Sequence, residues 1–250
     1  MKDNSCFGKV YLVGAGPGDP RLITLRGIEC LKQADLVLFD YLVNQELLEY
    51  APDSAERICL EHHGNSNAMS QDAVNRRMVE EARRGKTVVR LKNGDPSVFG
   101  RFAEEIAALH DAAIPFEIVP GVTAGLAAAA YADIPITHSW KSSAVALVTG
   151  HERSDKTASG LDYAALARFP GTLIFYMGVS SVSQWSKALM KEGKSPATPV
   201  AVVRRCSWPD QEIALCTLGT VAEVVETSSI SPPVVFLVGE VVELALKCPL

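Results

Sequence analysis

The chain has 250 residues, of which 48% are hydrophobic and 21% charged, a composition typical of a globular protein with a sizeable core. Its formal net charge of −5 argues against general binding to nucleic acid or to an anionic membrane surface. The cysteines are scattered without a CxxC pair, no signal peptide is visible, and no apolar run reaches the ~20 residues that span a bilayer. These features predict a cytoplasmic protein with reduced thiols.

The first predicted strand, at residues 9–13, leads into a glycine-rich loop, GAGPGDP, at 14–20. This loop differs from a dinucleotide fingerprint, because Pro17 has no N–H to give to a phosphate and Asp19 stands where glycine is expected. Asp19 and Pro20 instead predict an N-cap followed by proline at the first helical position. The loop therefore suits a ligand that lies close to the backbone but is not a phosphate.

Two strands deliver polar residues to their carboxyl ends in the next part of the chain. The strand at 35–39 ends before Asp40, and an acidic residue in such a place serves as a cap more often than as a catalyst. The strand at 57–60 runs into His62 and His63, which point to opposite sides of an extended chain and so do not favour a metal site. Helices are predicted at 22–33 and 70–84.

A second glycine-containing loop follows the strand at 88–92. The chain breaks at Asn93-Gly94-Asp95-Pro96, and a helical pattern resumes at 101–110. A simple β-turn explains this tetrapeptide taken alone. However, open α/β sheets bind ligands at the carboxyl ends of their strands, and the loop at 14–20 is of the same kind. Gly94 permits backbone angles closed to other residues and lets a ligand approach the main chain.

The alternation of strands and helices up to residue 131 predicts a largely parallel sheet. The pattern lapses at 134–141, which indicates a crossing between domains, and we expect domains at 8–137 and 138–245. Two successive strands at 200–204 and 213–218 predict an antiparallel component in the second domain. Further strands are expected at 116–119, 144–149, 172–176 and 233–238, and further helices at 126–131, 182–190 and 221–226.

Seven sequence blocks occur in a characteristic order: GAGPGDP (14–20), FDYLV (39–43), VVRLKNGDPSVFGR (88–101), PGVTAG (120–125), IPITH (134–138), VTGHE (148–152) and FYMG (175–178). Together they resemble the tetrapyrrole methylases, over most of the chain. The resemblance implies an α/β fold of two α/β domains with a trough between them that binds S-adenosyl-L-methionine (SAM), distinct from a Rossmann fold. It also implies a homodimer, and SAM agrees with the loop at 14–20 because it carries no phosphate.

Within this family the motifs favour members that act on uroporphyrinogen III. The resemblance therefore implies SAM-dependent C-methylation of uroporphyrinogen III at two ring carbons, giving precorrin-2, with S-adenosyl-L-homocysteine as the other product. Such reactions belong to porphyrin biosynthesis, in the routes to sirohaem and cobalamin. The alternatives are a methylase of another precorrin-type tetrapyrrole and a non-catalytic protein that binds SAM or a tetrapyrrole. No metal, nucleic acid or membrane is expected as a partner.

The resemblance also assigns individual residues. Asp40 matches the catalytic base, Arg101 matches an arginine on the substrate side, and His62 falls by ungapped count on a lysine regarded as a proton donor. Departures from the family concentrate on the substrate side: Phe102-Ala103 replaces Gly-Gly and Ser139-Trp140 replaces Arg-Asp. The residues expected to line the SAM site are Pro17, Asn93 (glycine in the family), Gly94, Asp95, Val98, Thr123, Ala124 and Met177, with Cys206 as a further member.

Overall fold

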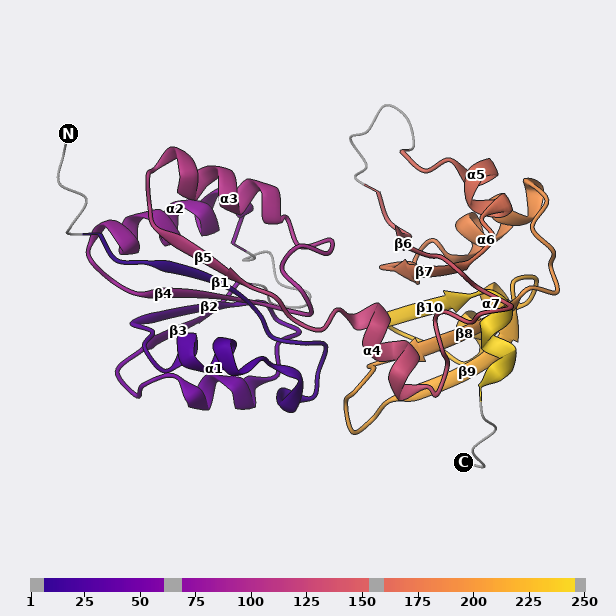
Figure 1. Ribbon diagram of the computed structural model, residues 1–250, viewed down its shortest axis with the longest axis horizontal. Helices are drawn as coiled ribbons and strands as arrows, with labels where there is room; N and C mark the ends of the chain where they lie inside the picture. Colours follow the sequence, from indigo (N-terminus) through magenta and orange to yellow (C-terminus); the bar gives the residue numbers. More distant parts are fainter. Residues whose placement is uncertain (1–6, 61–68, 153–159, 246–250) are drawn as a thin grey trace. The chain divides into compact units, whose positions relative to one another are not determined.

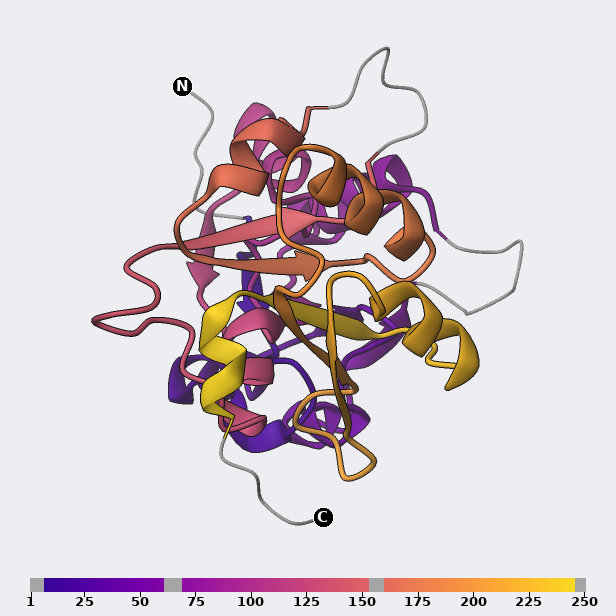
Figure 2. The same ribbon diagram turned by 90° about the vertical axis from the view of Figure 1, so that its right-hand side faces the viewer.

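The structure is a computed structural model that describes residues 7–60, 69–152 and 160–245 (Figures 1 and 2). Within these ranges the chain forms two compact units, each built on one open β-sheet with helices packed on it.

The division between the two units falls between Thr123 and Ala124, earlier than the expected division after residue 137. The reason is helix α4 (Ala124–Tyr131), which packs on strands of the second sheet and so belongs to the second unit. Its start is fixed there by a 2.8 Å hydrogen bond from the Gly125 amide to the Tyr176 hydroxyl.

The first unit is built on a parallel sheet with strand order β3-β2-β4-β1-β5. Residues in β1, β2 and β4 are buried, as expected for parallel strands covered on both faces. Helices α2 (Gln71–Arg83) and α3 (Phe102–Asp111) cover one face, while α1 (Leu25–Leu31) and a 3-10 helix at Gln45–Tyr50 cover the other (Figure 1). The strands are β1 (Val10–Gly14), β2 (Leu36–Phe39), β3 (Glu56–Cys59), β4 (Val88–Lys92) and β5 (Phe116–Val119).

Strand β4 departs from this apolar pattern on one of its faces. Val89 and Leu91 belong to the core cluster that contains α1, whereas Val88 belongs to the cluster under α2 and α3. Because side chains alternate along a strand, Arg90 and Lys92 lie on the Val88 face. Both are buried, with 5% and 2% of their surface exposed. A buried strand that carries two cations requires buried partners for them.

The second unit contains a mixed sheet with strand order β6-β7-β10-β8-β9. Strands β6 and β7 are parallel, and all other pairs are antiparallel, which confirms the antiparallel component expected from the sequence. The strands are β6 (Val145–Thr149), β7 (Thr172–Tyr176), β8 (Pro199–Arg204), β9 (Glu212–Thr217) and β10 (Val234–Val238).

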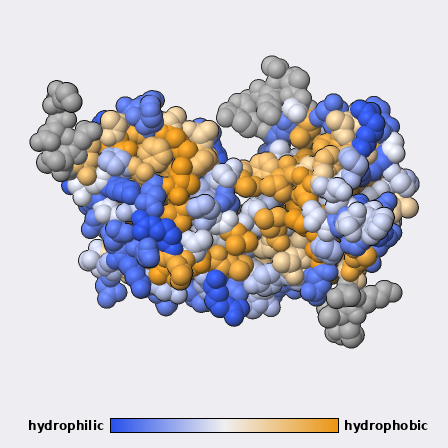
Figure 3. Space-filling view, viewed as in Figure 1, coloured by the Kyte–Doolittle hydropathy of each residue, from blue (hydrophilic) through white to orange (hydrophobic). Residues whose placement is uncertain are grey.

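The core of the second unit is centred on Trp185 of α6 (Val182–Lys191). Its ring stacks on Phe175 at 4.4 Å between centroids and meets Phe236 edge-on at 5.3 Å. Helices α5 (Tyr163–Arg168) and α7 (Val221–Thr227) complete the layer on this face. Apolar side chains also remain at the surface of this unit (Figure 3), including Leu147 of β6 and Ile213 and Leu215 of β9.

Short helices account for the main differences from the expected elements. The helix expected at 22–33 is divided into a 3-10 turn (Pro20–Leu22) and α1, because the Thr24 hydroxyl accepts a hydrogen bond from the Gly27 amide and begins a new helix. Sequence reasoning missed the 3-10 helix after β2, helix α5, and a 3-10 helix at Glu240–Leu244, all of six residues or fewer.

Candidate functional site

The two glycine-containing loops of the first unit are joined to each other through their backbones. The Gly94 amide donates to the Gly16 carbonyl at 2.8 Å, and the Gly16 amide donates back at 3.2 Å. Both glycines have positive φ, 76° at Gly16 and 68° at Gly94, which other residues adopt at a cost. The Ala15 amide adds a third bond, to the Lys92 carbonyl at 2.8 Å. The sequence-predicted ligand loops therefore lie side by side at the carboxyl end of the sheet.

A third loop, after β5, packs against the other two. Asp95 of the second loop joins it to the third, since one carboxylate oxygen accepts a hydrogen bond from the Gly121 amide at 2.9 Å. The other oxygen accepts hydrogen bonds from Ser97 within the second loop. A Cβ placed on Gly121 would lie 2.3 Å from the Gly94 carbonyl oxygen, and one on Gly14 would lie 2.6 Å from the Gly121 Cα. Glycine is therefore required where these loops meet, and Asp95 is engaged inside the loop structure.

Asp19 has the capping role that the sequence predicted. Its carboxylate accepts a hydrogen bond from the Arg21 amide at 2.9 Å, and Pro20 occupies the first helical position. The Arg21 side chain also pairs with this carboxylate at 2.6 Å. The neighbouring Pro17 is buried in the same loop. An anionic phosphate would meet a carboxylate at this helix start, so the loop favours a ligand without phosphate.

Asn93 is the first residue of the second loop, and it contacts Asp40, which directly follows β2. The backbone N–H of Asn93 donates a hydrogen bond to Asp40 Oδ2 at 2.9 Å. Its side-chain oxygen, Oδ1, is buried and has no hydrogen-bond partner among the described residues. A buried acceptor without a partner is costly unless a ligand or water supplies a donor. Val98, further along the loop, is half-buried, and Thr123 is buried at the end of the unit.

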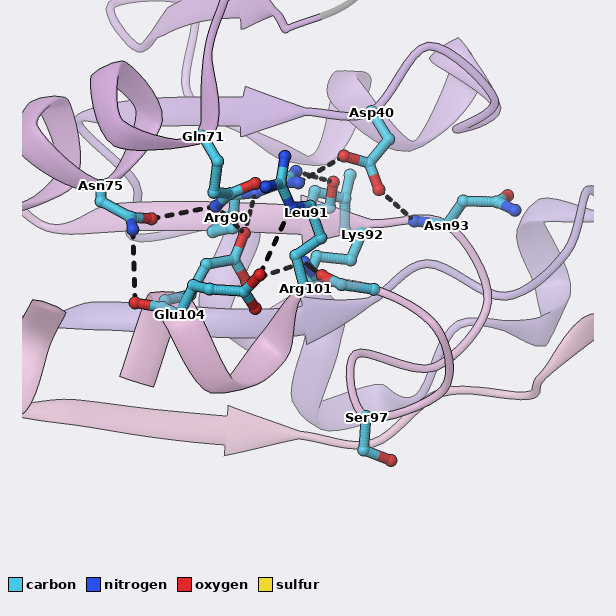
Figure 4. A network of polar contacts seen from close by, with 12 residues as sticks. Asp40, Gln71, Asn75, Arg90, Leu91, Lys92, Asn93, Ser97, Arg101 and Glu104 are labelled. Carbon is cyan, nitrogen blue, oxygen red and sulfur yellow. Dashed lines mark hydrogen bonds and ion pairs between the residues drawn. The ribbon is translucent and has the colours of Figure 1, made fainter. Parts of the chain in front are cut away.

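A network of charged side chains, three of them buried and one partly exposed, adjoins this loop (Figure 4). We call it the charge network, and it comprises Asp40, Arg90, Lys92 and Glu105. Arg90 joins the two acids: its Nη2 lies 2.5 Å from Asp40 Oδ1 and its Nε lies 3.0 Å from Glu105 Oε1. Lys92 Nζ lies 2.7 Å from Glu105 Oε2. Glu105 is fully buried, and a buried carboxylate is strongly unfavourable unless a cation pairs with it.

The surroundings shift the pKa values of both cations of the network, in opposite directions. Burial lowers the pKa of Arg90, but attraction to Asp40 and Glu105 outweighs it, so the net shift is upward and the guanidinium stays charged. Burial and the neighbouring Arg90 lower the pKa of Lys92, and Glu105 offsets only part of that effect. With two acids and two bases the network has no net charge when all four groups are ionised.

The same network also reaches the far end of the loop. Lys92 Nζ donates to the Gly100 carbonyl, directly before Arg101. Arg101 has a positive φ of 53°, and its side chain is 56% exposed, with Glu104 3.5 Å away. The guanidinium is therefore presented to solvent, where it can meet a carboxylate ligand. His62 lies outside the described residues.

In the second unit, two of the three predicted residues are in contact, and the third adjoins a residue that contacts the same helix. Cys206 Sγ donates to the Ala124 carbonyl at 3.6 Å, and Tyr176, hydrogen-bonded to the next residue of α4, directly precedes Met177. Met177 has a positive φ of 53° and is half exposed. Burial raises the pKa of the Cys206 thiol to about 12, so it is not a reactive thiolate at neutral pH.

Sequence reasoning missed Arg90, Lys92 and Glu105 as members of the site. The available signal was two basic residues, two positions apart, in a strand whose other residues are Val and Leu. Such a pattern indicates buried cations on one face, and hence a buried acid.

Residues 7–60, 69–152 and 160–245 contain neither a cluster of metal ligands nor a membrane-spanning helix. In this part of the chain no three His, Cys, Asp or Glu side chains are grouped so that they could hold a metal ion. In the same residues, no helix combines the length and apolar character needed to cross a membrane.

Comparison with known proteins identifies one family. A family model for the tetrapyrrole (corrin/porphyrin) methylases matches residues 9–222. Among curated relatives, the S-adenosyl-L-methionine-dependent uroporphyrinogen III methyltransferase of Methanosarcina barkeri is 44% identical, over 95% of this chain and 93% of that protein. The uroporphyrinogen-III C-methyltransferase of Priestia megaterium is 47% identical, over 96% of this chain and 100% of that protein.

Solved structures give a similar result. A uroporphyrin-III C-methyltransferase from Thermus thermophilus, complexed with S-adenosyl homocysteine, has a TM-score of 0.81 and 36% identity, covering 97% of this chain and 98% of that one. A cobalt precorrin-4 methyltransferase has a TM-score of 0.84 and 32% identity, covering 94% and 95%. Both likenesses extend over the two α/β units and confirm the expected fold class.

Proposed function

The chain belongs to the tetrapyrrole methylases, and from this premise we propose that it is an enzyme that transfers methyl groups from SAM to two ring carbons of uroporphyrinogen III, giving precorrin-2. The observation that carries the proposal is the hydrogen bond between the Asn93 amide and Asp40. It puts the proposed catalytic base within one contact of the loop proposed to bind SAM.

The first-unit loops suit SAM as a ligand. SAM brings hydroxyl and amino donors, which match the buried Oδ1 of Asn93, an acceptor that no described residue contacts through a hydrogen bond. It carries no phosphate, which matches the carboxylate at Asp19 and the missing N–H at Pro17. The residues proposed to contact SAM are Pro17, Asn93, Gly94, Asp95, Val98 and Thr123 of the first unit and Ala124, Met177 and Cys206 of the second.

In this reaction the protein has to align SAM with the tetrapyrrole and accept a proton from the tetrapyrrole. SAM supplies an activated methyl group. Alignment of two bound reactants can contribute ~7–11 kcal/mol to lowering a barrier. A pyrrole carbon becomes more nucleophilic as the ring N–H proton is lost, and Asp40 is the proposed acceptor of a proton. Its carboxylate is partly exposed at 25%, while Arg90 and the Asn93 amide fix its orientation.

The tetrapyrrole carries many carboxylates, and Arg101 is proposed to bind one of them. Its guanidinium is exposed and can grip a carboxylate through two parallel hydrogen bonds. Glu104, 3.5 Å away, is the group that a substrate carboxylate would have to displace. His62 is proposed as a proton donor in place of the family lysine.

The second candidate is methylation of another precorrin-type tetrapyrrole. It is favoured by the TM-score of 0.84 with the cobalt precorrin-4 methyltransferase. Purified protein given radiolabelled SAM and either uroporphyrinogen III or cobalt precorrin-4 distinguishes the two. We expect label in the tetrapyrrole fraction with uroporphyrinogen III. Label only with cobalt precorrin-4 would support the second candidate, and SAM binding without transfer to either would support a non-catalytic role.

Two further properties are proposed with this function. A homodimer is supported by the exposed apolar residues of the second unit, which a second copy would cover. Work in the cytoplasm is supported by Cys30, Cys206 and Cys216, which form no disulfide bond within the described residues, as expected in a reducing compartment. No nucleic acid or membrane is proposed as a partner. The product would enter porphyrin biosynthesis on the routes to sirohaem and cobalamin.

A further inference from the structure

Arg90 is the least expected residue of the charge network, because it is a buried arginine in the middle of a parallel sheet. Its guanidinium makes three different contacts. Nη2 pairs with Asp40 Oδ1 at 2.5 Å, Nε donates to Glu105 Oε1 at 3.0 Å, and Nη1 donates to the Leu91 carbonyl at 3.1 Å. Because the guanidinium is planar, these three contacts fix its plane and therefore the direction from which it holds Asp40.

Arg90 is not needed to neutralise the two acids of the charge network. Glu105 is neutralised by Lys92 at 2.7 Å, so its burial does not require a second cation. Asp40 is 25% exposed, so water can solvate its charge. Neutralisation alone would be met without an arginine at this position, whereas orientation of the Asp40 carboxylate would not.

Asp40 is held at both of its oxygens. Oδ1 faces Arg90, and Oδ2 accepts a hydrogen bond from the backbone N–H of Asn93 at the start of the second loop (Figure 4). Rotation of the carboxylate away from Arg90 would also disturb the hydrogen bond to Asn93. The position of Arg90 is thus transmitted through Asp40 to the loop.

We propose that Arg90, fixed by Glu105 and Leu91, is a positioning residue for methyl transfer that acts through Asp40. The proposal rests on the proposed function, in which Asp40 handles the proton of the acceptor. Arg90 itself does not touch the acceptor. Its role is to hold the carboxylate in one orientation between the loop and the reacting ring.

The test is a double-mutant cycle between Arg90→Lys and Asp40→Asn, measured as kcat with uroporphyrinogen III. Lysine keeps the positive charge, but its single ammonium cannot span Asp40 and Glu105 together. We expect Arg90→Lys to lower kcat by about 100-fold, the order of loss seen when a reacting group is misplaced. KM for the tetrapyrrole should change less than about 3-fold, because uniform binding is not removed. In the Asp40→Asn background, Arg90→Lys should lower kcat no further.

A purely structural role gives a different result. The thermal midpoint would then fall while kcat per SAM-binding site stays at the wild-type value, or the two substitutions would add. Either outcome overturns the proposal. Arg84→Lys is the matched control, because Arg84 also pairs with a buried acid, Glu81, at 2.5 Å but lies at the end of α2, outside the network. It should leave kcat unchanged.

A second variant covers the case in which Arg90→Lys does not fold. Arg90→Gln leaves the Lys92–Glu105 pair intact and leaves the charge of the partly exposed Asp40 to solvent, and it should show the same loss of kcat and the same non-additivity. Wild-type turnover tests the proposed function by itself. Where the wild type is inactive with uroporphyrinogen III, the cycle is measured on SAM affinity by calorimetry. Arg90→Gln should then weaken SAM binding at least about 3-fold, and only when Asp40 is present; unchanged affinity overturns the proposal.

Discussion

Gly94 is the residue on which the proposed SAM loop depends most directly. Its φ of 68° and its paired hydrogen bonds with Gly16 require a conformation that a side chain disfavours. We predict that Gly94→Ala weakens SAM binding at least about 10-fold by shifting this backbone. Calorimetry on the folded variant measures it.

Gly193 is the matched control for this substitution. It also has a positive φ, 98°, but apart from its chain neighbours no described residue has a heavy atom within 4 Å of the position a Cβ would take. Gly193→Ala should therefore have a similar backbone cost, about 1 kcal/mol of unfolding free energy, without a change in SAM affinity. Equal affinity for Gly94→Ala and Gly193→Ala would remove the loop from the proposed site.

Arg101 should contribute to binding of the tetrapyrrole and not to binding of SAM. We predict that Arg101→Ala raises KM for uroporphyrinogen III about 10-fold or more, the loss of one charge-assisted contact, with SAM affinity within about 2-fold of wild type. Because the guanidinium is 56% exposed, the wild-type KM should also rise with salt as the screening length falls below ~10 Å. Steady-state kinetics across a salt series measure both effects. The exposed Arg83 at the end of α2 provides an arginine-to-alanine control. A salt-independent KM would contradict carboxylate binding by Arg101.

At the scale of single elements, the meeting point of three loops is the most constrained part of the first unit. A Cβ on Gly121 would lie 2.3 Å from the Gly94 carbonyl oxygen, which is backbone and cannot move alone. We predict that Gly121→Ala separates the β4 and β5 loops and abolishes measurable SAM binding while the two cores stay folded. Gly219→Ala, where the nearest atom would be 3.2 Å away in Pro196, is a milder steric control. Wild-type affinity for Gly121→Ala would contradict the packing described for these loops.

Glu117 of β5 forms ion pairs with Arg26 of α1 and with Lys9, which directly precedes β1. Hydrogen bonds from Arg26 and Lys9 lower the pKa of Glu117 from 4.5 to about 2. The folded state therefore favours the ionised form. The stabilisation is complete above pH 4.5 and is lost as the pH falls through about 2. Glu117→Gln should cost about 0.5–1 kcal/mol near pH 6, since the pair is partly exposed.

Urea unfolding from pH 6 to pH 3 measures this effect. The difference in unfolding free energy between wild type and Glu117→Gln should shrink as the pH falls. A difference that stays constant over this range would show that the Glu117 ion pairs do not stabilise the fold.

The elements that the sequence predicted well are those with strong local signals. Ser70 caps α2 through its side chain, and Gly85 follows the helix with a φ of 85°, so the helix expected at 70–84 has a local signal at each end. The short helices were missed because one or two turns carry too few apolar residues for a periodic pattern. Their capping residues, Asn44 and Asp162, were the signals available.

At the scale of the whole molecule, the lapse at 134–141 predicted two units, and the succession of strands and helices predicted their different sheet types. It did not predict the unit boundary, because α4 is rich in alanine and its sequence does not indicate which sheet it covers. The packing of Gly125 against Tyr176 decides this, and that contact joins residues far apart in the chain. The charge network was missed for the same reason: Asp40, Arg90 and Glu105 come from three separate elements.

The most direct test of the proposed function is the mass of the tetrapyrrole product. Purified protein is incubated anaerobically with uroporphyrinogen III and excess SAM, and the product is analysed by mass spectrometry over time. The proposal predicts a species with one added methyl group that converts to one with two, while S-adenosyl-L-homocysteine accumulates in equal measure to the methyl groups transferred. Unmodified uroporphyrinogen III, from a preparation that binds SAM, would contradict it.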